Sequence, residues 1–317
     1  MNNVPEYADV LKAYKRIIPY IHRTPVLTST AINRITGAEL FFKCENFQKT
    51  GAFKFRGATN AVLSLSEEEA ARGVATHSSG NHAAALALTA GMRGIKAHIV
   101  MPETSPGVKI AAVKGYGAEI TFCKPTLEAR ESTLKKIVNE TGAIFIHPYN
   151  NPQVIAGQGT AALELLGEVP GLGIVMAPVG GGGLLSGTAT TVKGSHPGIK
   201  IIAAEPAGAD DAYRSFKSGT LVPSVNPKTI CDGLLTSLGD LTFNIIMRRV
   251  DDIVTVSEEA IFMATCLVME RMKIVIEPSA AVPLGAILEN KLNAEGKRIG
   301  IILSGGNVDV GKLQGNK

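Results

Sequence analysis

The chain lacks the features that mark several classes of protein. It has four widely spaced cysteines and no C-x-x-C pair, which argues against a disulfide framework and against a cysteine-ligated zinc site. No apolar run reaches the roughly 18 residues that a membrane-spanning helix needs. Residues 1–6 do not combine a charged start with an apolar stretch, as a secretory signal would. We therefore expect a soluble, cytoplasmic protein with no membrane partner.

Other absences exclude particular functions. The 32 basic and 28 acidic residues are interspersed and leave a net charge of +4, so no basic block predicts nucleic-acid binding. The G-x-S-x-G elbow of α/β-hydrolases is absent. The H-E-x-x-H zinc motif is also absent, and the six histidines are scattered. We expect neither an α/β-hydrolase nor a catalytic zinc enzyme.

The order of apolar and polar residues predicts an α/β protein of two domains. At 317 residues the chain exceeds the size at which a single core usually stops growing. Short apolar or β-branched runs alternate with helical patterns, as in parallel sheets that helices cover on both faces. The expected strands are residues 40–44, 74–77, 97–101, 119–123, 143–146, 174–177, 199–204 and 299–303, and the expected helices include 81–90, 127–141, 158–166 and 258–272. Four strand–helix units predict a small mobile domain, residues 73–147, inserted into a large domain of residues 1–72 and 148–317.

Lys54 is the most informative single residue. It stands between Phe53 and Phe55, with Gly51 and Gly57 three residues to either side. Burying an ammonium group among aromatic rings is costly and lowers its pKa. A lysine in that state is a nucleophile that reacts with aldehydes. The alternative is an ordinary helical lysine whose aliphatic stem covers the two phenylalanines.

A run of glycines follows the expected strand 174–177. It consists of Gly180, Gly181, Gly182 and Gly183, after which Leu184 opens a helix. Backbone N–H groups in such a turn, at a helix N-terminus, converge on an anion such as phosphate. The run lacks the Gly-Lys-Ser/Thr ending of a nucleotide loop and the spacing of a dinucleotide fingerprint. It therefore predicts the phosphate of a ligand smaller than ATP or NAD, with a flexible structural turn as the alternative.

Two further polar turns follow expected strands. Residues 78–82 read Ser-Ser-Gly-Asn-His and precede a helix, which suits either a carboxylate ligand or an ordinary helix cap. Within them, His82 is a candidate general base, with a structural role as the alternative. Residues 304–307 read Ser-Gly-Gly-Asn directly after strand 299–303, and ligands of open α/β sheets lie at the carboxyl ends of strands.

Together, these four motifs make the chain resemble the fold-type II pyridoxal-phosphate enzymes, and among them the serine racemase and serine/threonine dehydratase family. The resemblance covers residues 7–309. It implies two open, twisted, mostly parallel α/β domains with the cofactor in the cleft between them, assembled as a homodimer. Lys54 would carry pyridoxal 5'-phosphate, and the four glycines with Leu184 would bind its phosphate.

The same resemblance assigns the residues around the cofactor ring. Asn81 would hydrogen-bond the ring hydroxyl, and Ser304 would face the pyridine nitrogen. A neutral hydroxyl there does not keep the nitrogen protonated, which makes the ring a weaker electron sink. Phe53 and Glu277 would lie near the ring.

For the substrate, the resemblance implies a small amino acid and two catalytic groups, Lys54 and Ser79. They would serve opposite faces of the Cα atom and convert L-serine to D-serine, with pyruvate and ammonia from a side elimination. The implied substrate-binding residues are Ser78, Ser79, Gly80, Asn81, His82 and Arg130. An exposed helix face is the alternative for Arg130. Tyr149, an aromatic residue where dehydratases tend to have one, favours the alternative function of a serine/threonine or 3-hydroxyaspartate dehydratase.

An acidic cluster and a nucleotide site complete the implied features. Glu205 and Asp211 would supply carboxylates, and Ala209 a backbone carbonyl, to Mg²⁺ or Ca²⁺. Without the resemblance, these acidic residues are typical of a helix N-terminus. ATP remains open as an activator, because Ser29, Lys49 and Thr50 align with a nucleotide site at the dimer interface of the animal racemases, although a second serine of that site is missing here.

Overall fold

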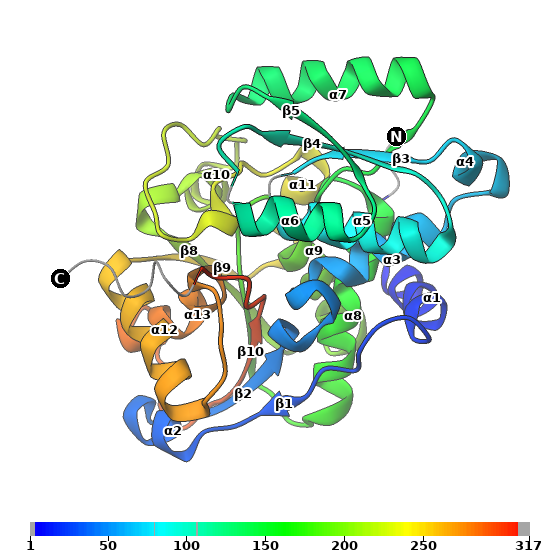
Figure 1. Cartoon of the computed structure of the whole chain (residues 1–317). Helices are drawn as coiled ribbons and strands as arrows, with labels where there is room; N and C mark the ends of the chain where they lie inside the picture. The colour runs from blue at the N-terminus through cyan, green and yellow to red at the C-terminus, as the bar shows by residue number, and fades with distance from the viewer. Residues whose placement is uncertain (1–3, 79, 106, 310–317) are drawn as a thin grey trace.

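The computed structural model describes residues 4–78, 80–105 and 107–309, and its strands form two separate sheets (Figure 1). In the described part of the chain, the larger sheet has six strands in the order β1-β2-β10-β7-β8-β9. All of its neighbouring pairs are parallel except β1 with β2. These strands are β1 (Val26–Leu27), β2 (Glu39–Cys44), β7 (Ile174–Pro178), β8 (Lys200–Pro206), β9 (Asp252–Val256) and β10 (Arg298–Leu303).

The smaller sheet has four strands within the described residues, in the order β5-β4-β3-β6, and all pairs are parallel. They are β3 (Val74–His77), β4 (Ala97–Pro102), β5 (Glu119–Cys123) and β6 (Ile144–Phe145). The predicted α/β class with two mostly parallel sheets is therefore confirmed.

Thirteen α-helices occur in the described residues. They are α1 (Tyr7–Ile17), α2 (Thr30–Thr36), α3 (Lys54–Leu63), α4 (Glu67–Ala71), α5 (Asn81–Arg93), α6 (Gly107–Gly115), α7 (Leu127–Thr141), α8 (Pro152–Glu168), α9 (Gly183–Ser195), α10 (Asp211–Ser218), α11 (Asp240–Arg249), α12 (Glu258–Met272) and α13 (Pro278–Leu288). Ser66 and Glu69 form the capping box of α4. No helix among the described residues is long and apolar enough to span a membrane.

Helices cover both faces of each sheet because successive strand residues point to opposite sides. In β7, Ile174 and Met176 pack with α12 and α13, whereas Val175 and Ala177 pack with α8 and α9. In the smaller sheet, α7 covers one face, and α5 with α6 lies on the other (Figure 1). Strands buried on both faces explain the near-continuous apolar runs in the sequence.

The helix α8 begins earlier than its pattern predicts. It starts at Pro152, with Asn151 as its N-cap, rather than at Gln158. Gly157 lies inside the helix, where a Cβ atom would be 2.7 Å from the Cα of Gly57 in α3. The glycines therefore allow close packing of α8 against the helix that begins at Lys54.

Candidate active site

The predicted motifs come together beyond the carboxyl ends of β7 and β10. The glycine loop, residues 180–183, follows β7, and Ser304 follows β10. The backbone N–H of Phe53 donates to the Ser304 carbonyl at 3.0 Å, and Ala52 forms a β-bridge with Gly305. The start of α3 is thereby fixed directly to the turn after β10.

Lys54 lies half-buried among aromatic rings. Its Nζ atom donates to the Pro148 carbonyl oxygen at 2.9 Å. The same atom is 5.1 Å from the ring centre of Phe53 and 6.0 Å from that of Tyr149. Burial lowers the pKa of the Lys54 amine to about 8, and the Glu277 carboxylate opposes that shift. With a pKa of about 8, about a tenth of the Lys54 amine is uncharged at pH 7, far more than of an ordinary lysine, which suits a nucleophile.

The glycine loop is shaped so that side chains would not fit. Gly182 has a left-handed φ of +85° and caps α9. A Cβ atom on Gly181 would lie 2.5 Å from ring carbons of Tyr149. Because the loop leads into the N-terminus of α9, its backbone suits a phosphate, as the cofactor would require. Leu184, in the first turn of α9, is buried in the core beneath it.

Asn81 and Glu277 contact each other rather than facing separate parts of a site. The Asn81 side-chain amide donates to both Glu277 carboxylate oxygens at 3.0 and 3.1 Å. Asn307 donates to the Asn81 oxygen at 3.0 Å. Burial raises the pKa of Glu277 to about 7, and its hydrogen bond with Asn81 acts in the opposite direction. Two residues predicted near one ligand, Asn81 and Glu277, thus form one polar cluster with Asn307.

The turn at residues 78–82 is described only in part. Ser79 lies outside the described residues. The Ser78 hydroxyl accepts a weak hydrogen bond from the Gly80 N–H at 3.4 Å. His82 is buried, with Nε2 3.2 Å from the Ile146 carbonyl oxygen. Burial lowers the pKa of His82 well below its usual value, so the ring is neutral, and its catalytic role stays a prediction.

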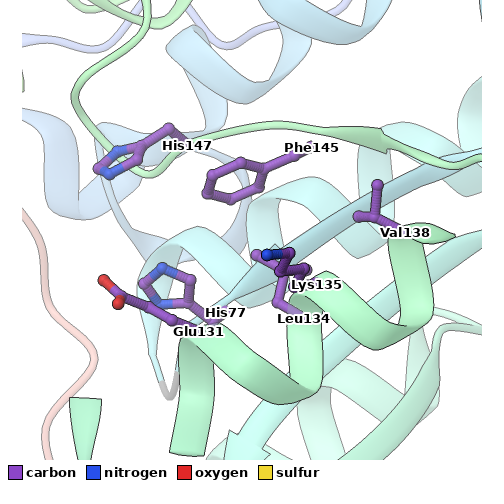
Figure 2. Close-up of a pocket in the computed structure, with 7 residues that line it drawn as sticks. All are labelled: His77, Glu131, Leu134, Lys135, Val138, Phe145 and His147. Atoms are coloured by element: carbon purple, nitrogen blue, oxygen red, sulfur yellow. The ribbon is translucent and has the colours of Figure 1, made fainter. Parts of the chain in front are cut away.

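Arg130 lies on α7, and its Nε donates to the Thr126 carbonyl at 3.4 Å. Its charge adds to the burial that lowers the pKa of His77 to about 4. A cavity of about 320 Å³ lies between α7 and the ends of β3 and β6 (Figure 2). The cavity is lined by His77, Glu131, Leu134, Lys135, Val138, Phe145 and His147.

The predicted metal ligands lie together at the end of β8. The Glu205 carboxylate accepts hydrogen bonds from two backbone N–H groups of α10, at 3.0 and 2.7 Å. The buried Asp211 oxygens accept no hydrogen bond of ordinary geometry within the described residues. Burial raises the pKa of Glu205 to about 8 and that of Asp211 to about 6. Ala209 lies between them in a short 3₁₀ turn, Ala207–Ala209.

These carboxylates fit a hard cation, but they do not form a complete site. Among the described residues, no group of three or more His, Cys, Asp or Glu side chains could hold a metal. Backbone oxygens and water would have to complete the coordination.

A buried cluster of charges around Arg56, two residues after Lys54, was not predicted. Arg56 pairs with Glu45 at 2.7 Å and with Glu164 at 2.8 Å, and Lys43 pairs with Glu164 at 2.7 Å. All four side chains are at most 1% exposed. The signal available in the sequence was Glu164, a carboxylate inside the apolar run 161–166.

Comparison with known proteins agrees with this arrangement. Residues 17–305 match the family model described as pyridoxal-phosphate dependent enzyme. The chain is 53% identical over 313 residues to the beta-hydroxyaspartate dehydratase of Paracoccus denitrificans (strain Pd 1222), covering 99% of each chain. It is 54% identical over 309 residues to the serine racemase of Dictyostelium discoideum, covering 96% of this chain and 95% of that one. The crystal structure of the Dictyostelium discoideum serine racemase superposes with a TM-score of 0.93 over 97% of this chain and 100% of the other.

Proposed function

Because this chain belongs to the family of pyridoxal-phosphate-dependent enzymes, we propose that it converts L-serine to D-serine and eliminates water from serine as a side reaction. The side reaction yields pyruvate and ammonia. The observation that carries the proposal is the position of Lys54, whose amine has a pKa of about 8 and which lies near the glycine loop. Serine racemases of about half-identical sequence support the choice of reaction.

The residues of the candidate site have separate proposed roles in binding the cofactor and in moving the Cα proton. Pyridoxal phosphate supplies, when bound, the electron sink that makes the Cα proton acidic. The glycine loop and Leu184 would hold its phosphate, Asn81 and Ser304 would contact the ring, and Phe53 and Glu277 would lie beside it. Lys54 accepts the Cα proton on one face.

On the substrate side, the Ser79 hydroxyl returns a proton to the opposite face of Cα. The remaining residues of the turn at 78–82 bind the substrate, together with Arg130, which pairs with its carboxylate. Residues 73–147 form a small domain that closes over the substrate and excludes water. In support, every described strand of the four-stranded sheet falls within that range.

The direct test is product analysis with L-serine. D-serine and pyruvate should both form, and the absence of D-serine would overturn the racemase assignment. Ser79→Ala should abolish racemisation and spare elimination from L-serine, since Lys54 is still present. Equal loss of both reactions would remove Ser79 from its role.

A second candidate is a dehydratase for 3-hydroxyaspartate, serine or threonine. The 53% identical relative from Paracoccus and the aromatic Tyr149 near Lys54 favour it. Parallel assays with L-serine, L-threonine and 3-hydroxyaspartate distinguish the two: faster ammonia release from 3-hydroxyaspartate, without racemised serine, identifies the dehydratase.

We also propose that Glu205, Asp211 and the Ala209 carbonyl hold Mg²⁺ or Ca²⁺. The buried Asp211 oxygens support this, since they accept no hydrogen bond of ordinary geometry within the described residues and a cation would satisfy them. Millimolar Mg²⁺ or Ca²⁺ should raise the thermal unfolding midpoint of the wild type and leave that of Glu205→Ala unchanged. Equal shifts in both proteins would contradict the site.

The assembly and location follow from the same resemblance. We propose a cytoplasmic homodimer, in which Ser29, Lys49 and Thr50 are the residues through which ATP would act as an activator. Light scattering gives the mass, and a monomer would contradict the dimer. Comparing the activity with and without Mg²⁺-ATP tests whether the nucleotide activates the enzyme, and equal activities would contradict activation.

A further inference from the structure

His147 holds the turn that follows β6. Its Nδ1 atom accepts hydrogen bonds from the backbone N–H of Tyr149 at 3.3 Å and of Asn150 at 3.0 Å. An atom that accepts from two donors needs its lone pair, so the ring must be unprotonated at Nδ1. Burial lowers the pKa of His147 to about 4, and the His77 ring and Lys54 add to this effect. At neutral pH His147 is therefore an acceptor.

The other side of this turn touches the two central parts of the active site. The Pro148 carbonyl, between His147 and Tyr149, accepts the hydrogen bond from Lys54 at 2.9 Å. The Tyr149 ring packs so closely on the glycine loop that a Cβ atom on Gly181 would lie within 2.5 Å of three of its carbons. One turn thus sets the position of the lysine amine and supports the phosphate loop.

The His147 ring also fixes the Tyr149 ring directly. The two rings meet edge to face, with centres 4.6 Å apart and planes at 84°. On its far side, His147 lies with His77 and Phe145 at the cavity beside α7 (Figure 2). It makes no described hydrogen bond to Lys54, so it acts on the lysine through the turn.

We propose that His147 is a positioning residue, whose Nδ1 acceptor holds Pro148 against Lys54 and Tyr149 against the glycine loop. The proposal rests on the proposed function only in taking Lys54 as the reacting amine. Without the acceptor, two backbone N–H groups in a half-buried turn lose their partner, and the turn relaxes to satisfy them. Lys54 then loses its fixed position, which lowers kcat more than it changes substrate binding.

Two substitutions separate this role from simple packing. In His147→Asn, the side-chain oxygen stands the same number of bonds from the backbone as Nδ1 and keeps the acceptor. His147→Leu keeps much of the bulk and removes the acceptor. His196→Leu is the matched control, because His196 is exposed at the end of α9, and its Nδ1 meets only the neighbouring Ser195 hydroxyl in the described chain.

The first measurement is amide hydrogen exchange at Tyr149 and Asn150 in the purified full-length chain, which requires no activity. Both amides should be protected in the wild type, in His147→Asn and in His196→Leu, and unprotected in His147→Leu. Retained protection in His147→Leu would overturn the proposal, whatever reaction the enzyme catalyses.

The second measurement is kcat and KM with whichever substrate the product analysis identifies. His147→Leu should lower kcat about tenfold, as expected for the loss of ordinary hydrogen bonds that orient the reacting group, with KM changed much less. His147→Asn should recover most of that loss. Equal impairment of the two variants, at similar thermal midpoints, would assign His147 a packing role and contradict the proposal.

Discussion

The side-chain amide of Asn81 lies 3.0 and 3.1 Å from the two carboxylate oxygens of Glu277, 196 residues further along the chain. The contact joins the start of α5, beside the smaller sheet, to the residue before α13, beside the larger one. An ion pair between Lys109 of α6 and Asp232 also joins the proposed small domain to the proposed large domain. The proposed small domain is therefore already held against the large one at the candidate active site.

The buried Glu277 should make the stability of the protein depend on pH. Its pKa is raised from 4.5 to about 7 by burial, so the folded state binds more protons than the unfolded state between these values. The contribution of Glu277 to the free energy of unfolding is fully present below about pH 4.5 and is lost as the pH rises through about 7. The loss amounts to about 3 kcal/mol, at 1.36 kcal/mol for each pKa unit.

Glu277→Gln removes this titration. Urea denaturation at pH 5 and pH 8 should show a smaller decrease in the free energy of unfolding for the variant than for the wild type. Glu67→Gln, whose side chain is 96% exposed, should behave like the wild type. The same pH dependence in Glu277→Gln and wild type would contradict the assigned pKa.

The ion pairs of Arg56 should be essential for stability. Arg56→Met would leave the carboxylates of Glu45 and Glu164 buried without their main partner, at a cost of about 3 to 5 kcal/mol of unfolding free energy. Lys12→Met, which removes an exposed pair with Asp9, should cost less than about 1 kcal/mol. Urea denaturation at pH 7 measures both. Similar small losses in the two variants would show that the buried cluster contributes little.

Local patterns were enough to predict most of the fold. Eight predicted strands are present. Six of them, β2, β3, β4, β7, β8 and β10, are largely buried, which makes them nearly continuous apolar runs, whereas the edge strands β5 and β6 are partly exposed. The strands β1 and β9 were not predicted. The first has only two residues, and the second is an edge strand with partly exposed residues, so neither gives a clear apolar run.

Short motifs in the sequence were enough to single out Lys54 and the glycine loop as candidate site residues. The partners of Arg56 lie 11 and 108 residues away, and only the packing of α3 against α8 brings the farther one, Glu164, next to Arg56. The role of His147 depends on a turn whose geometry no spacing reveals. Residues that act through tertiary contacts therefore had to be found in the structure.

Gly181 should tolerate no side chain. In Gly181→Ala, the added Cβ would clash with the Tyr149 ring, which His147 holds in place. Overpacking of this kind costs about 1 to 3 kcal/mol, and it should weaken pyridoxal-phosphate binding about tenfold or more. Gly167→Ala is the control, because no atom lies within 4 Å of its Cβ and alanine favours the helix. Spectroscopic titration measures the affinity for pyridoxal phosphate, and thermal unfolding measures the loss of stability. Unchanged cofactor affinity in Gly181→Ala would contradict the proposal that the glycine loop binds the phosphate.

The pKa of Lys54 predicts how the cofactor-free chain takes up pyridoxal phosphate. Only the uncharged amine reacts with an aldehyde, so the rate of uptake should rise with pH around a midpoint of about 8, rather than near the ordinary lysine value of 10.5. The Glu277 carboxylate raises the pKa of Lys54, so Glu277→Gln should move the midpoint below 8.

Stopped-flow absorbance from pH 6 to pH 10 gives both profiles, with Glu67→Gln as the control. A midpoint above 10 in the wild type would mean that Lys54 is solvated, whereas an unchanged midpoint in Glu277→Gln would mean that the two groups do not interact.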